Sequence, residues 1–251
     1  MADAPALQAT TLTRRFGGLT AVNAVSLSLH VGEVHAVIGT NGAGKSTLVN
    51  LLSGELATDE GHVTLGAHDV THWPQPKRAR AGIGRSYQRS TLFGEFSVLE
   101  NCRLSAQSAL QRPWHVWQTA SRCDQSLAVA QEVLATTGLA DVASRIAGTL
   151  SHGQKRQLEV AMCLATRPQV LLLDEPLAGM GAEETERMLA LLQSLKPTHA
   201  VLLIEHDMDA VFRVADRITV MVDGQVIASD VPGRIRTHPE VLRAYLGEAF
   251  A

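Results

Sequence analysis

A nine-residue glycine-rich segment has the residue types and the spacing of a phosphate-binding loop. Its sequence is GTNGAGKST, and its members are Gly39, Thr40, Asn41, Gly42, Ala43, Gly44, Lys45, Ser46 and Thr47. Glycines let the backbone turn tightly and bring its N–H groups close to an anion. Lys45 adds a compact positive charge for the β- and γ-phosphates, and the Ser46 hydroxyl is placed to ligate Mg²⁺. The pattern therefore predicts a site for a nucleoside triphosphate and its magnesium ion.

Two apolar runs end in polar residues that could complete such a site. Residues 170–173 are followed by Asp174 and Glu175, and residues 200–204 are followed by an acid and then His206. Asp174 is a candidate Mg²⁺ ligand, and Glu175 is a candidate base or positioner for an attacking water. His206 could donate a hydrogen bond to a γ-phosphate, although its spacing alone fits a structural or surface histidine equally well.

A third segment, LSHGQ at residues 150–154, directly precedes an expected helix. Ser151 could cap that helix, and Gln154 stands three residues later, which is the spacing of a capping box. Helix N-termini attract anions, so the segment is a candidate for a second anion site. On the local sequence alone, an ordinary helix cap is an open alternative.

The elements that must position these groups follow from hydrophobic periodicity. Apolar or alternating runs predict strands at residues 12–16, 22–31, 34–38, 61–65, 82–88, 170–173, 200–204, 218–222 and 226–228. Longer patterns predict helices at residues 45–52, 98–110, 125–137, 157–165, 183–195 and 239–246. Asp223 and Gly224 predict a hairpin turn between the last two strands. Alternating strands and helices indicate an α/β fold with an open, mostly parallel sheet, whose ligands bind at the carboxyl ends of its strands.

The composition restricts the class of protein. The chain has 251 residues, enough for one large domain or a core domain with a subdomain, and its formal net charge is −3. A negative net charge gives no overall electrostatic attraction to nucleic acid. The sequence contains no apolar run of about 18 residues, the length that a membrane-spanning helix needs, so any spanning part of a transport process would belong to other chains.

Two groups of residues are interpreted as structural. The first is a basic cluster, which we interpret as a solvated surface rather than a nucleic-acid site and which contains Lys77, Arg78, Arg80, Arg85 and Arg89. The second is the set of three cysteines, Cys102, Cys123 and Cys163, which form no C-x-x-C pair. We expect these cysteines to be reduced structural thiols.

Taken together, the segments resemble the ATP-binding cassette (ABC) ATPases, the nucleotide-binding subunits of ABC transporters, over nearly the whole chain. Residues 39–47 resemble the Walker A loop and residues 170–175 the Walker B strand with its catalytic glutamate. Residues 150–154 resemble the family signature, which is usually LSGGQ. Three single residues match family positions: Gln88 the Q-loop glutamine, His206 the switch histidine, and Phe16 the aromatic that stacks on adenine.

The resemblance implies a site for ATP and Mg²⁺ with distinct groups of residues. The catalytic residues would be Glu175 and His206, and the metal-binding residues would be Ser46, Gln88 and Asp174. Nucleotide contacts would come from Phe16, residues 39–47 and Gln88 of one subunit. Further contacts would come from Ser151, Gly153 and Gln154 of a second cassette, because two cassettes of this family close head to tail around two ATP molecules.

The resemblance also implies a fold, partners and a location. The fold would be that of a P-loop NTPase, with a single cassette domain at residues 1–251, an N-terminal antiparallel β subdomain, a helical subdomain inserted at about 89–160 and a C-terminal tail at 232–251. The partners would be two transmembrane permease subunits, a second cassette of the same or a different kind and, indirectly, a solute-binding protein. The protein would lie peripherally on the cytoplasmic face of the bacterial inner membrane. The helical subdomain would dock on the permease, and Gln88 would link that contact to the nucleotide.

Three residues depart from the family pattern, and the subfamily rests on shorter segments. Thr40 stands where proline is common, His152 replaces a signature glycine, and Gly181 stands where an aspartate usually makes a contact across the dimer. Residues 171–181, 205–212 and 241–248 resemble the cassettes of bacterial branched-chain amino acid importers. Importers of urea and short amides and the lipopolysaccharide-export cassette are the nearest alternatives.

A soluble ABC ATPase of DNA repair or translation is the alternative from another class. Repair members carry a long coiled coil between the two nucleotide motifs, and this chain has no sustained heptads there. Translation members usually carry two cassettes, and this chain has one set of motifs. A regulatory ATP-binding module without turnover is disfavoured because Lys45, Asp174, Glu175 and His206 are all present.

Overall fold

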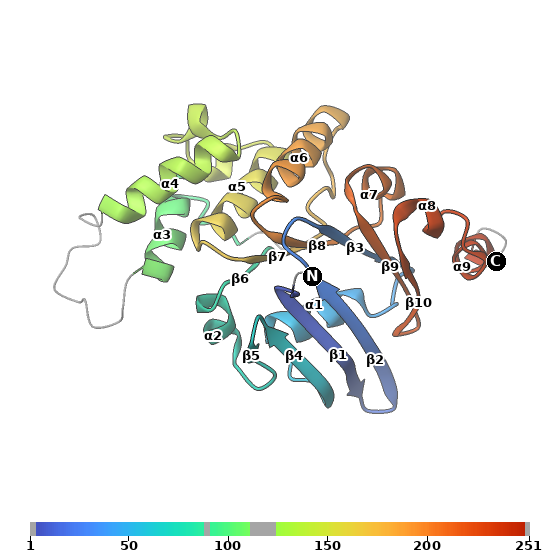
Figure 1. The fold of residues 1–251 in the computed structure, drawn as a ribbon. Helices are drawn as coiled ribbons and strands as arrows, with labels where there is room; N and C mark the ends of the chain where they lie inside the picture. The colour runs from blue at the N-terminus through green and yellow to red at the C-terminus, as the bar shows by residue number, and fades with distance from the viewer. Residues whose placement is uncertain (1–3, 88–90, 111–123, 249–251) are drawn as a thin grey trace.

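The computed structural model describes residues 4–87, 91–110 and 124–248, and its main element is a six-stranded sheet. The sheet contains β3 (Val34–Gly39), β6 (Ile83–Arg85), β7 (Val170–Asp174), β8 (Ala200–Ile204), β9 (Arg217–Val222) and β10 (Gln225–Asp230). Their order is β10-β9-β3-β8-β7-β6, and β10 is antiparallel to β9 while the other neighbours run parallel (Figure 1). The expected α/β fold with a mostly parallel sheet is confirmed.

A second sheet is antiparallel and comes from the N-terminal part of the chain. It contains β1 (Leu7–Phe16), β2 (Leu19–Leu29), β4 (Glu60–Leu65) and β5 (His68–Asp69), in the order β2-β1-β4-β5. Figure 1 shows this sheet below the main sheet, with the first helix between them. The expected N-terminal antiparallel β region is therefore present.

The helices cover the main sheet on both faces. They are α1 (Lys45–Ser53), α2 (Gln75–Arg80), α3 (Val98–Leu110), α4 (Asp124–Thr136), α5 (His152–Ala165), α6 (Ala182–Leu195), α7 (Met208–Val214), α8 (Pro232–Ile235) and α9 (Pro239–Glu248). Two short 3₁₀ turns, η2 (Ala140–Val142) and η3 (Ala147–Thr149), precede α5. Helices α3, α4 and α5 pack against one another, on the side of the molecule away from α8 and α9 (Figure 1). The boundaries of an inserted helical subdomain stay a prediction.

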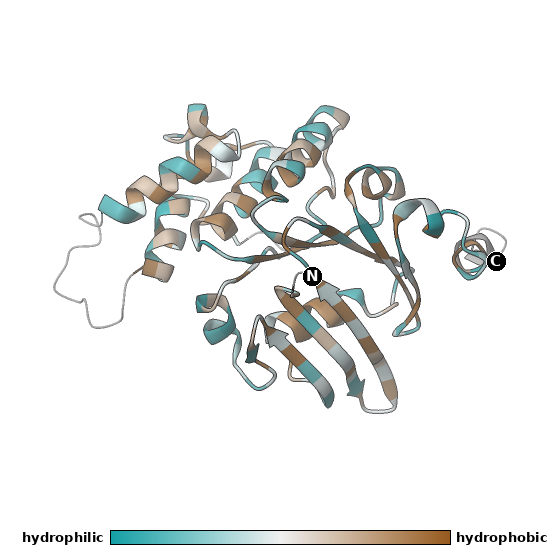
Figure 2. Ribbon diagram, viewed as in Figure 1, coloured by the Kyte–Doolittle hydropathy of each residue, from teal (hydrophilic) through white to brown (hydrophobic). Residues whose placement is uncertain are grey.

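Two hydrophobic cores flank the main sheet, and β7 contributes to both. Leu171 and Leu173 pack into the core under α3 to α7, whereas Val170 and Leu172 pack into the core that contains α1 and the antiparallel sheet. An uninterrupted apolar run is what a strand buried on both faces requires. Figure 2 shows the matching pattern on the helices, where hydrophobic and hydrophilic bands alternate along α3 to α6. The sheet edge that carries the polar residues after β7 and β8 is thus held by packing on both sides.

Several predicted boundaries need correction. Strands β1 and β2 begin earlier than residues 12 and 22, β6 ends at Arg85 instead of residue 88, and α5 begins at His152 instead of residue 157. Helices α2, α7 and α8 have four to seven residues and were not predicted, because such short segments carry too little periodicity. Helix α7 is fixed by a cap instead, in which the Asp207 carboxylate accepts from the Ala210 amide at 3.1 Å.

The interpretation of the basic cluster as a solvated surface is wrong for two of its members. Arg78 is buried, and its guanidinium donates to the backbone carbonyls of Leu51 and Leu52 at 2.7 and 2.8 Å. Arg85 is largely buried and forms an ion pair with Glu55 at 2.6 Å. Lys77 and Arg80 are exposed as expected, and Arg89 lies outside the described residues. Burial of Arg78 is tolerated because several carbonyl oxygens satisfy its donors.

Other predictions are confirmed. Asp223 and Gly224 both adopt positive φ, at 47° and 78°, and connect β9 and β10 in the predicted hairpin. Cys102 and Cys163 are free and buried, and burial raises the pKa of each thiol to about 12, so both behave as structural residues. Cys123 lies outside the described residues. Within the described part of the chain, no helix has the length and apolar character that crossing a membrane requires.

Candidate nucleotide site

The phosphate loop, residues 39–47, connects the end of β3 to the start of α1. Two of its glycines are required by close backbone contacts: a Cβ at Gly39 would lie 2.1 Å from the carbonyl oxygen of Met221, and one at Gly44 would lie 2.2 Å from that of Ala21. Gly44 is the N-cap of α1 with φ of 94°, and no side chain caps this helix end. The first turn of α1 therefore presents backbone N–H groups that can bind phosphate.

Lys45 places its ammonium group over the same loop. Its Nζ donates to the carbonyl oxygen of Gly39 at 2.6 Å and to that of Thr40 at 2.9 Å. The positive charge thus lies at the helix N-terminus, where the helix dipole already favours an anion. Both contributions attract the same phosphate groups.

A cavity of about 640 Å³ opens above the loop and has the size of a nucleotide site. Its lining includes most of the predicted loop residues, namely Asn41, Gly42, Ala43, Gly44, Lys45, Ser46 and Thr47. Phe16 and Glu175 line it as well, so the fold brings these two predicted residues to the loop. The remaining wall consists of Leu19, Thr20, Ala21, Asp223 and Gly224 at the tips of two hairpins, and the sequence analysis assigned none of them to the site.

Phe16 offers the cavity a half-exposed aromatic ring. Its side chain is at the end of β1, and the Arg14 guanidinium lies 5.0 Å from the ring centroid. An exposed ring at the cavity edge can stack on a planar base. The geometry is compatible with the adenine contact that the resemblance implies.

Asp174 is the last residue of β7 and is buried. Burial raises the pKa of its carboxyl group, whereas the positive charges of Arg85 and Lys45 act in the opposite direction. The backbone N–H of Asp174 donates to the Ser86 hydroxyl at 3.1 Å, which fixes the end of the strand. A carboxylate and the Ser46 hydroxyl are hard oxygen donors, so these residues fit Mg²⁺.

Glu175 has a backbone conformation that most residues avoid. Its φ is 51°, and its N–H donates to the carbonyl oxygen of Ile204 at 3.0 Å. A non-glycine residue in this region stores roughly 1 to 3 kcal/mol of strain, which is often found where a side chain must be aimed precisely at a ligand. Here the conformation places Glu175 in the lining of the cavity.

His206 lies beside Glu175, at the end of the neighbouring strand. Its Nδ1 is 3.9 Å from Oε1 of Glu175, and its side chain is 65% exposed. The sequence left a surface role for His206 open. The structure places it close to a cavity-lining acid, although His206 itself is not among the residues that line the cavity, and its catalytic role stays a prediction.

Glu205 is a positioning residue that the sequence analysis did not identify. Its carboxylate is 1% exposed and accepts from the backbone N–H of Leu177 at 2.8 Å and from that of His206 at 3.2 Å. Burial raises the pKa of this carboxyl group. Glu205 thereby ties the segment after Glu175 to the start of the segment that carries His206. Its place between a fully apolar strand and a histidine was the available signal.

The signature segment, residues 150–154, does not line this cavity. Ser151 is the N-cap of α5, its hydroxyl accepts from the Gln154 N–H at 3.2 Å, and the Gln154 side chain accepts from the Ser151 N–H at 3.2 Å. The predicted capping box is confirmed. Gly153 lies in the first turn of the same helix. Within the described residues, Ser151, Gly153 and Gln154 are therefore grouped together but apart from the phosphate loop.

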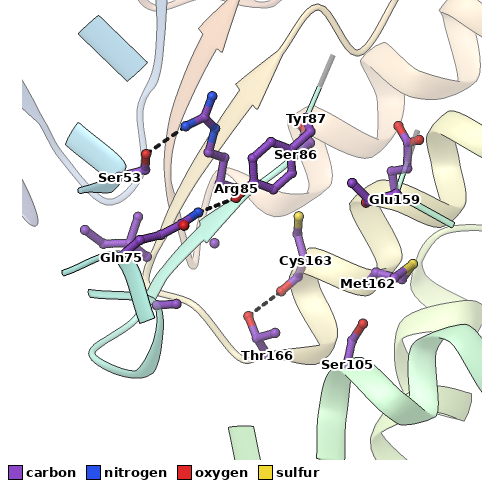
Figure 3. Close-up of a pocket in the computed structure, with 14 residues that line it drawn as sticks. Ser53, Gln75, Arg85, Ser86, Tyr87, Ser105, Glu159, Met162, Cys163 and Thr166 are labelled. Carbon is purple, nitrogen blue, oxygen red and sulfur yellow. Dashed lines mark hydrogen bonds between the residues drawn. The ribbon is translucent and has the colours of Figure 1, made fainter. Parts of the chain in front are cut away.

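A second, smaller cavity of about 210 Å³ lies between α2, β6, α3 and α5 (Figure 3). Gln75, Arg85, Tyr87 and Glu159 are among its lining residues, and the Gln75 amide donates to the Tyr87 hydroxyl. The backbone carbonyl of Tyr87 accepts from Arg156 of α5 at 3.2 Å. Gln88, a predicted ligand of nucleotide and metal, is the next residue and lies outside the described residues. The cavity thus adjoins the chain segment that leads to Gln88.

Comparison with known families identifies two matching regions. Residues 22–178 match the family described as ABC transporter. Residues 225–251 match the family described as branched-chain amino acid ATP-binding cassette transporter. The first match includes the phosphate loop, the signature segment and the two acids at the end of β7, Asp174 and Glu175.

Individual relatives match over nearly their whole length. The chain is 39% identical to the high-affinity branched-chain amino acid transport ATP-binding protein BraF of Pseudomonas aeruginosa, covering 98% of this chain and 99% of that protein. It is 40% identical to the corresponding protein LivG of Escherichia coli, with the same coverage.

Solved structures give the same result for the fold. The ADP conformation of an ATP-binding cassette of an ABC transporter superposes with a TM-score of 0.88 at 30% identity, covering 98% of this chain and 100% of that chain. A nucleotide-free ATP-binding cassette from an ABC transporter superposes with a TM-score of 0.86 at 30% identity, covering 96% and 98%.

Proposed function

Because the chain belongs to the family of ABC transporter ATP-binding cassettes, we propose that it is the ATP-hydrolysing subunit of an importer for branched-chain amino acids. The observation that carries the proposal is the 640 Å³ cavity, in which the phosphate loop, Phe16 and Glu175 meet. The names of the relatives and the match at residues 225–251 favour branched-chain amino acids over urea, short amides or lipopolysaccharide.

In the proposed site each group acts on a different part of ATP–Mg²⁺. The amides of the phosphate loop and the Lys45 ammonium bind the β- and γ-phosphates, and Phe16 stacks on the adenine. Ser46 and Asp174 hold Mg²⁺, together with Gln88, which lies outside the described residues. When bound, the ion would supply positive charge to the phosphate groups.

Hydrolysis requires an activated water and stabilisation of the γ-phosphate. Glu175 accepts a proton from the attacking water while the water oxygen bonds to the γ-phosphorus and the bond to the bridging oxygen of ADP breaks. His206, which lies 3.9 Å from Glu175, donates a hydrogen bond to a γ-phosphate oxygen. Glu205 accepts from the backbone N–H groups of Leu177, two residues after Glu175, and of His206, and so helps to position both segments.

A second cassette completes the site in this proposal. Ser151, Gly153 and Gln154 do not line the cavity of their own subunit, which supports a role for them at the γ-phosphate that the partner cassette binds. The second cassette is either another copy of this chain or a different one. The pair drives two transmembrane permease subunits from the cytoplasmic face of the bacterial inner membrane, and a solute-binding protein delivers the solute to the permease.

An exposed apolar patch supports a contact between the helical region and the permease. Phe93 and Phe96 are 51% and 45% exposed, with ring centroids 5.7 Å apart, and Ile146 is 45% exposed. The residue after Phe96 pairs with Ile146 through a β-bridge, so Ile146 lies on a backbone segment next to the one that carries the two rings. Exposed patches of this kind mark interaction sites, and we assign this one to a cytoplasmic loop of the permease.

Affinity purification tests the proposed function. The tagged chain is extracted from its host's membranes in mild detergent, and the proteins that co-purify are identified. Two multi-span permease subunits support the proposal, and the solute taken up by the reconstituted complex identifies the substrate. A chain that stays in the soluble fraction, or that arrives with ribosomes or DNA, would instead support the soluble ABC ATPase.

A matched pair of variants tests the docking patch in the same experiment. Phe93→Ser with Phe96→Ser should lower the yield of permease, because an apolar contact is lost. Leu242→Ser removes an equally exposed hydrophobic side chain from α9 and should leave the yield unchanged. Equal yields from both variants would exclude the patch as the docking site.

A further inference from the structure

A carboxylate from α6 covers the first turn of α5, where the two helices lie side by side (Figure 1). Oε1 of Glu184 accepts from the Ser151 hydroxyl at 2.9 Å, and Oε2 accepts from the Gly181 N–H at 3.4 Å. A Cβ added to Gly153 would lie 2.2 Å from the carboxyl carbon of Glu184 and 2.5 Å from each of its oxygens. The carboxylate therefore lies directly against the signature segment, on its serine and over its glycine.

The charge of this region explains why an acid is held there. Helix α5 has no acidic residue in its first turn, and Lys155 and Arg156 follow the signature segment. The N-terminus of a 14-residue helix carries a partial positive charge that favours an anion. Glu184, from the first turn of α6, supplies that anion from another helix.

The proposed function brings a second anion to the same surface. When two cassettes close head to tail, the γ-phosphate of the partner's ATP meets Ser151 and Gly153. The Ser151 hydroxyl has one proton to donate, and Glu184 already accepts it. Two anions in contact repel each other strongly where water is excluded. The carboxylate and the phosphate therefore cannot occupy this surface together.

We propose that Glu184 is an internal competitor of ATP that occupies the signature segment in the open subunit and must swing away before two cassettes close. The inference rests on the proposed function, because it uses the head-to-tail assembly. It makes Glu184 a residue that sets the ATP concentration at which the dimer forms. Removal of its charge should favour closure.

The surrounding contacts allow this movement without unfolding of either helix. Nε2 of His152 lies 2.9 Å from the carbonyl oxygen of Ala178, which joins the signature segment to the loop before α6 independently of Glu184. A Cβ at Gly179 would lie 2.9 Å from the same ring nitrogen, so the loop packs closely on His152. Rotation of the Glu184 side chain would uncover Ser151 at the cost of two hydrogen bonds, the one from Ser151 and the capping contact with the Gly181 N–H at the start of α6.

The test measures dimer formation against ATP concentration by sedimentation velocity. It uses the full chain with Glu175→Gln, so that ATP persists, together with the partner cassette if a different one co-purifies. Glu184→Gln keeps the size and an acceptor oxygen, and Glu184→Ala removes the group. Both should lower the ATP concentration at half-maximal dimerisation by at least about fivefold, the lower end of common coupling effects. Glu183→Gln, which removes an exposed acid one residue away, should leave it unchanged.

Two other outcomes would contradict either the role of Glu184 or the assembly on which it rests. If Glu184→Ala raises the required ATP concentration or leaves it unchanged while melting temperatures match, Glu184 is a structural support of Ser151 and the inference is wrong. If the parent chain with Glu175→Gln fails to dimerise at any ATP concentration, the head-to-tail assembly itself is refuted. The two failures are therefore distinguishable.

Discussion

The N-termini of α1 and α5, the two candidate anion sites of the sequence analysis, differ in how the chain itself satisfies their backbone N–H groups. At α1 the N-cap is Gly44, no side chain caps the helix, and the first turn contains no acid. At α5 the N-cap is Ser151 in a complete capping box, and Glu184 lies against the first turn. The first end is left open for a ligand, whereas the second is already satisfied by groups of the same chain.

Under the proposed function, this difference corresponds to two different stages of one reaction. An open end, with Lys45 beside it, can bind nucleotide in a single subunit. At α5 the polar groups already have hydrogen-bond partners within the chain. In the proposed function, a phosphate therefore reaches this helix end only when a second cassette brings it. Under the proposed function, nucleotide binding is therefore assigned to α1 and assembly to α5.

The largest expected effect comes from substitution of Glu175, the acid that is proposed to activate the attacking water. Glu175→Gln should leave ATP binding intact and reduce hydrolysis by at least about 10²-fold, because a base that accepts the proton of water is lost. Steady-state release of phosphate measures the rate, and a direct titration measures binding. Glu183→Gln is the control for removal of an acid. Turnover near that of the unmodified chain would show that another group activates the water.

Replacement by alanine of the glycine at each helix end should change the free energy of unfolding by different amounts. At Gly44 the added Cβ would meet the carbonyl oxygen of Ala21, a backbone atom, and φ is 94°. We expect Gly44→Ala to lower the free energy of unfolding by about 1 to 3 kcal/mol. At Gly153 the Cβ would meet the movable Glu184 side chain, so Gly153→Ala should change it by less than about 1 kcal/mol. Urea unfolding of both variants checks the order, and equal losses would contradict it.

A buried histidine in β3, the strand that leads into the phosphate loop, should make the stability of the protein depend on pH. His35 of β3 is buried, with Nδ1 3.1 Å from the Ser28 carbonyl oxygen and Nε2 2.7 Å from the Thr219 hydroxyl. Burial lowers the pKa of His35 from 6.5 to about 4, and the nearby Arg217 and His30 act in the same direction. The unfolded chain therefore binds the proton more tightly, and stability falls as the pH drops below the unfolded value.

The expected loss is about 2 kcal/mol between about pH 7.5 and about pH 5, measured as the free energy of unfolding in urea. His35→Asn should remove this slope, whatever its effect at neutral pH. Glu33, whose carboxylate lies 3.6 Å from His35, has a raised pKa and opposes the slope at lower pH. His62→Gln changes an exposed histidine and should keep the slope. A slope that persists in His35→Asn would place its source elsewhere.

The local features of both helix ends could be predicted from the sequence, whereas the contacts between distant segments could not. The strand before Gly39, the helix that starts at Lys45 and the capping box of Ser151 follow from local patterns, and all three are confirmed. Glu184 contacts Ser151 across 33 residues, and Glu205 contacts Leu177 across 28. Such contacts depend on which helices and strands become neighbours, which periodicity does not specify. The position of Asp223 at the cavity was unpredictable for the same reason, because it requires β9 to pair with β3.

The most direct measurement of the central comparison is a titration of the isolated chain with ATP and Mg²⁺ by calorimetry. Lys45→Ala should weaken nucleotide binding by at least about tenfold, because a charge that contacts the phosphates is lost. Ser151→Ala should leave the affinity of the single subunit unchanged. Unchanged affinity in Lys45→Ala, or an equal loss in Ser151→Ala, would contradict the assignment of binding to α1 and of assembly to α5.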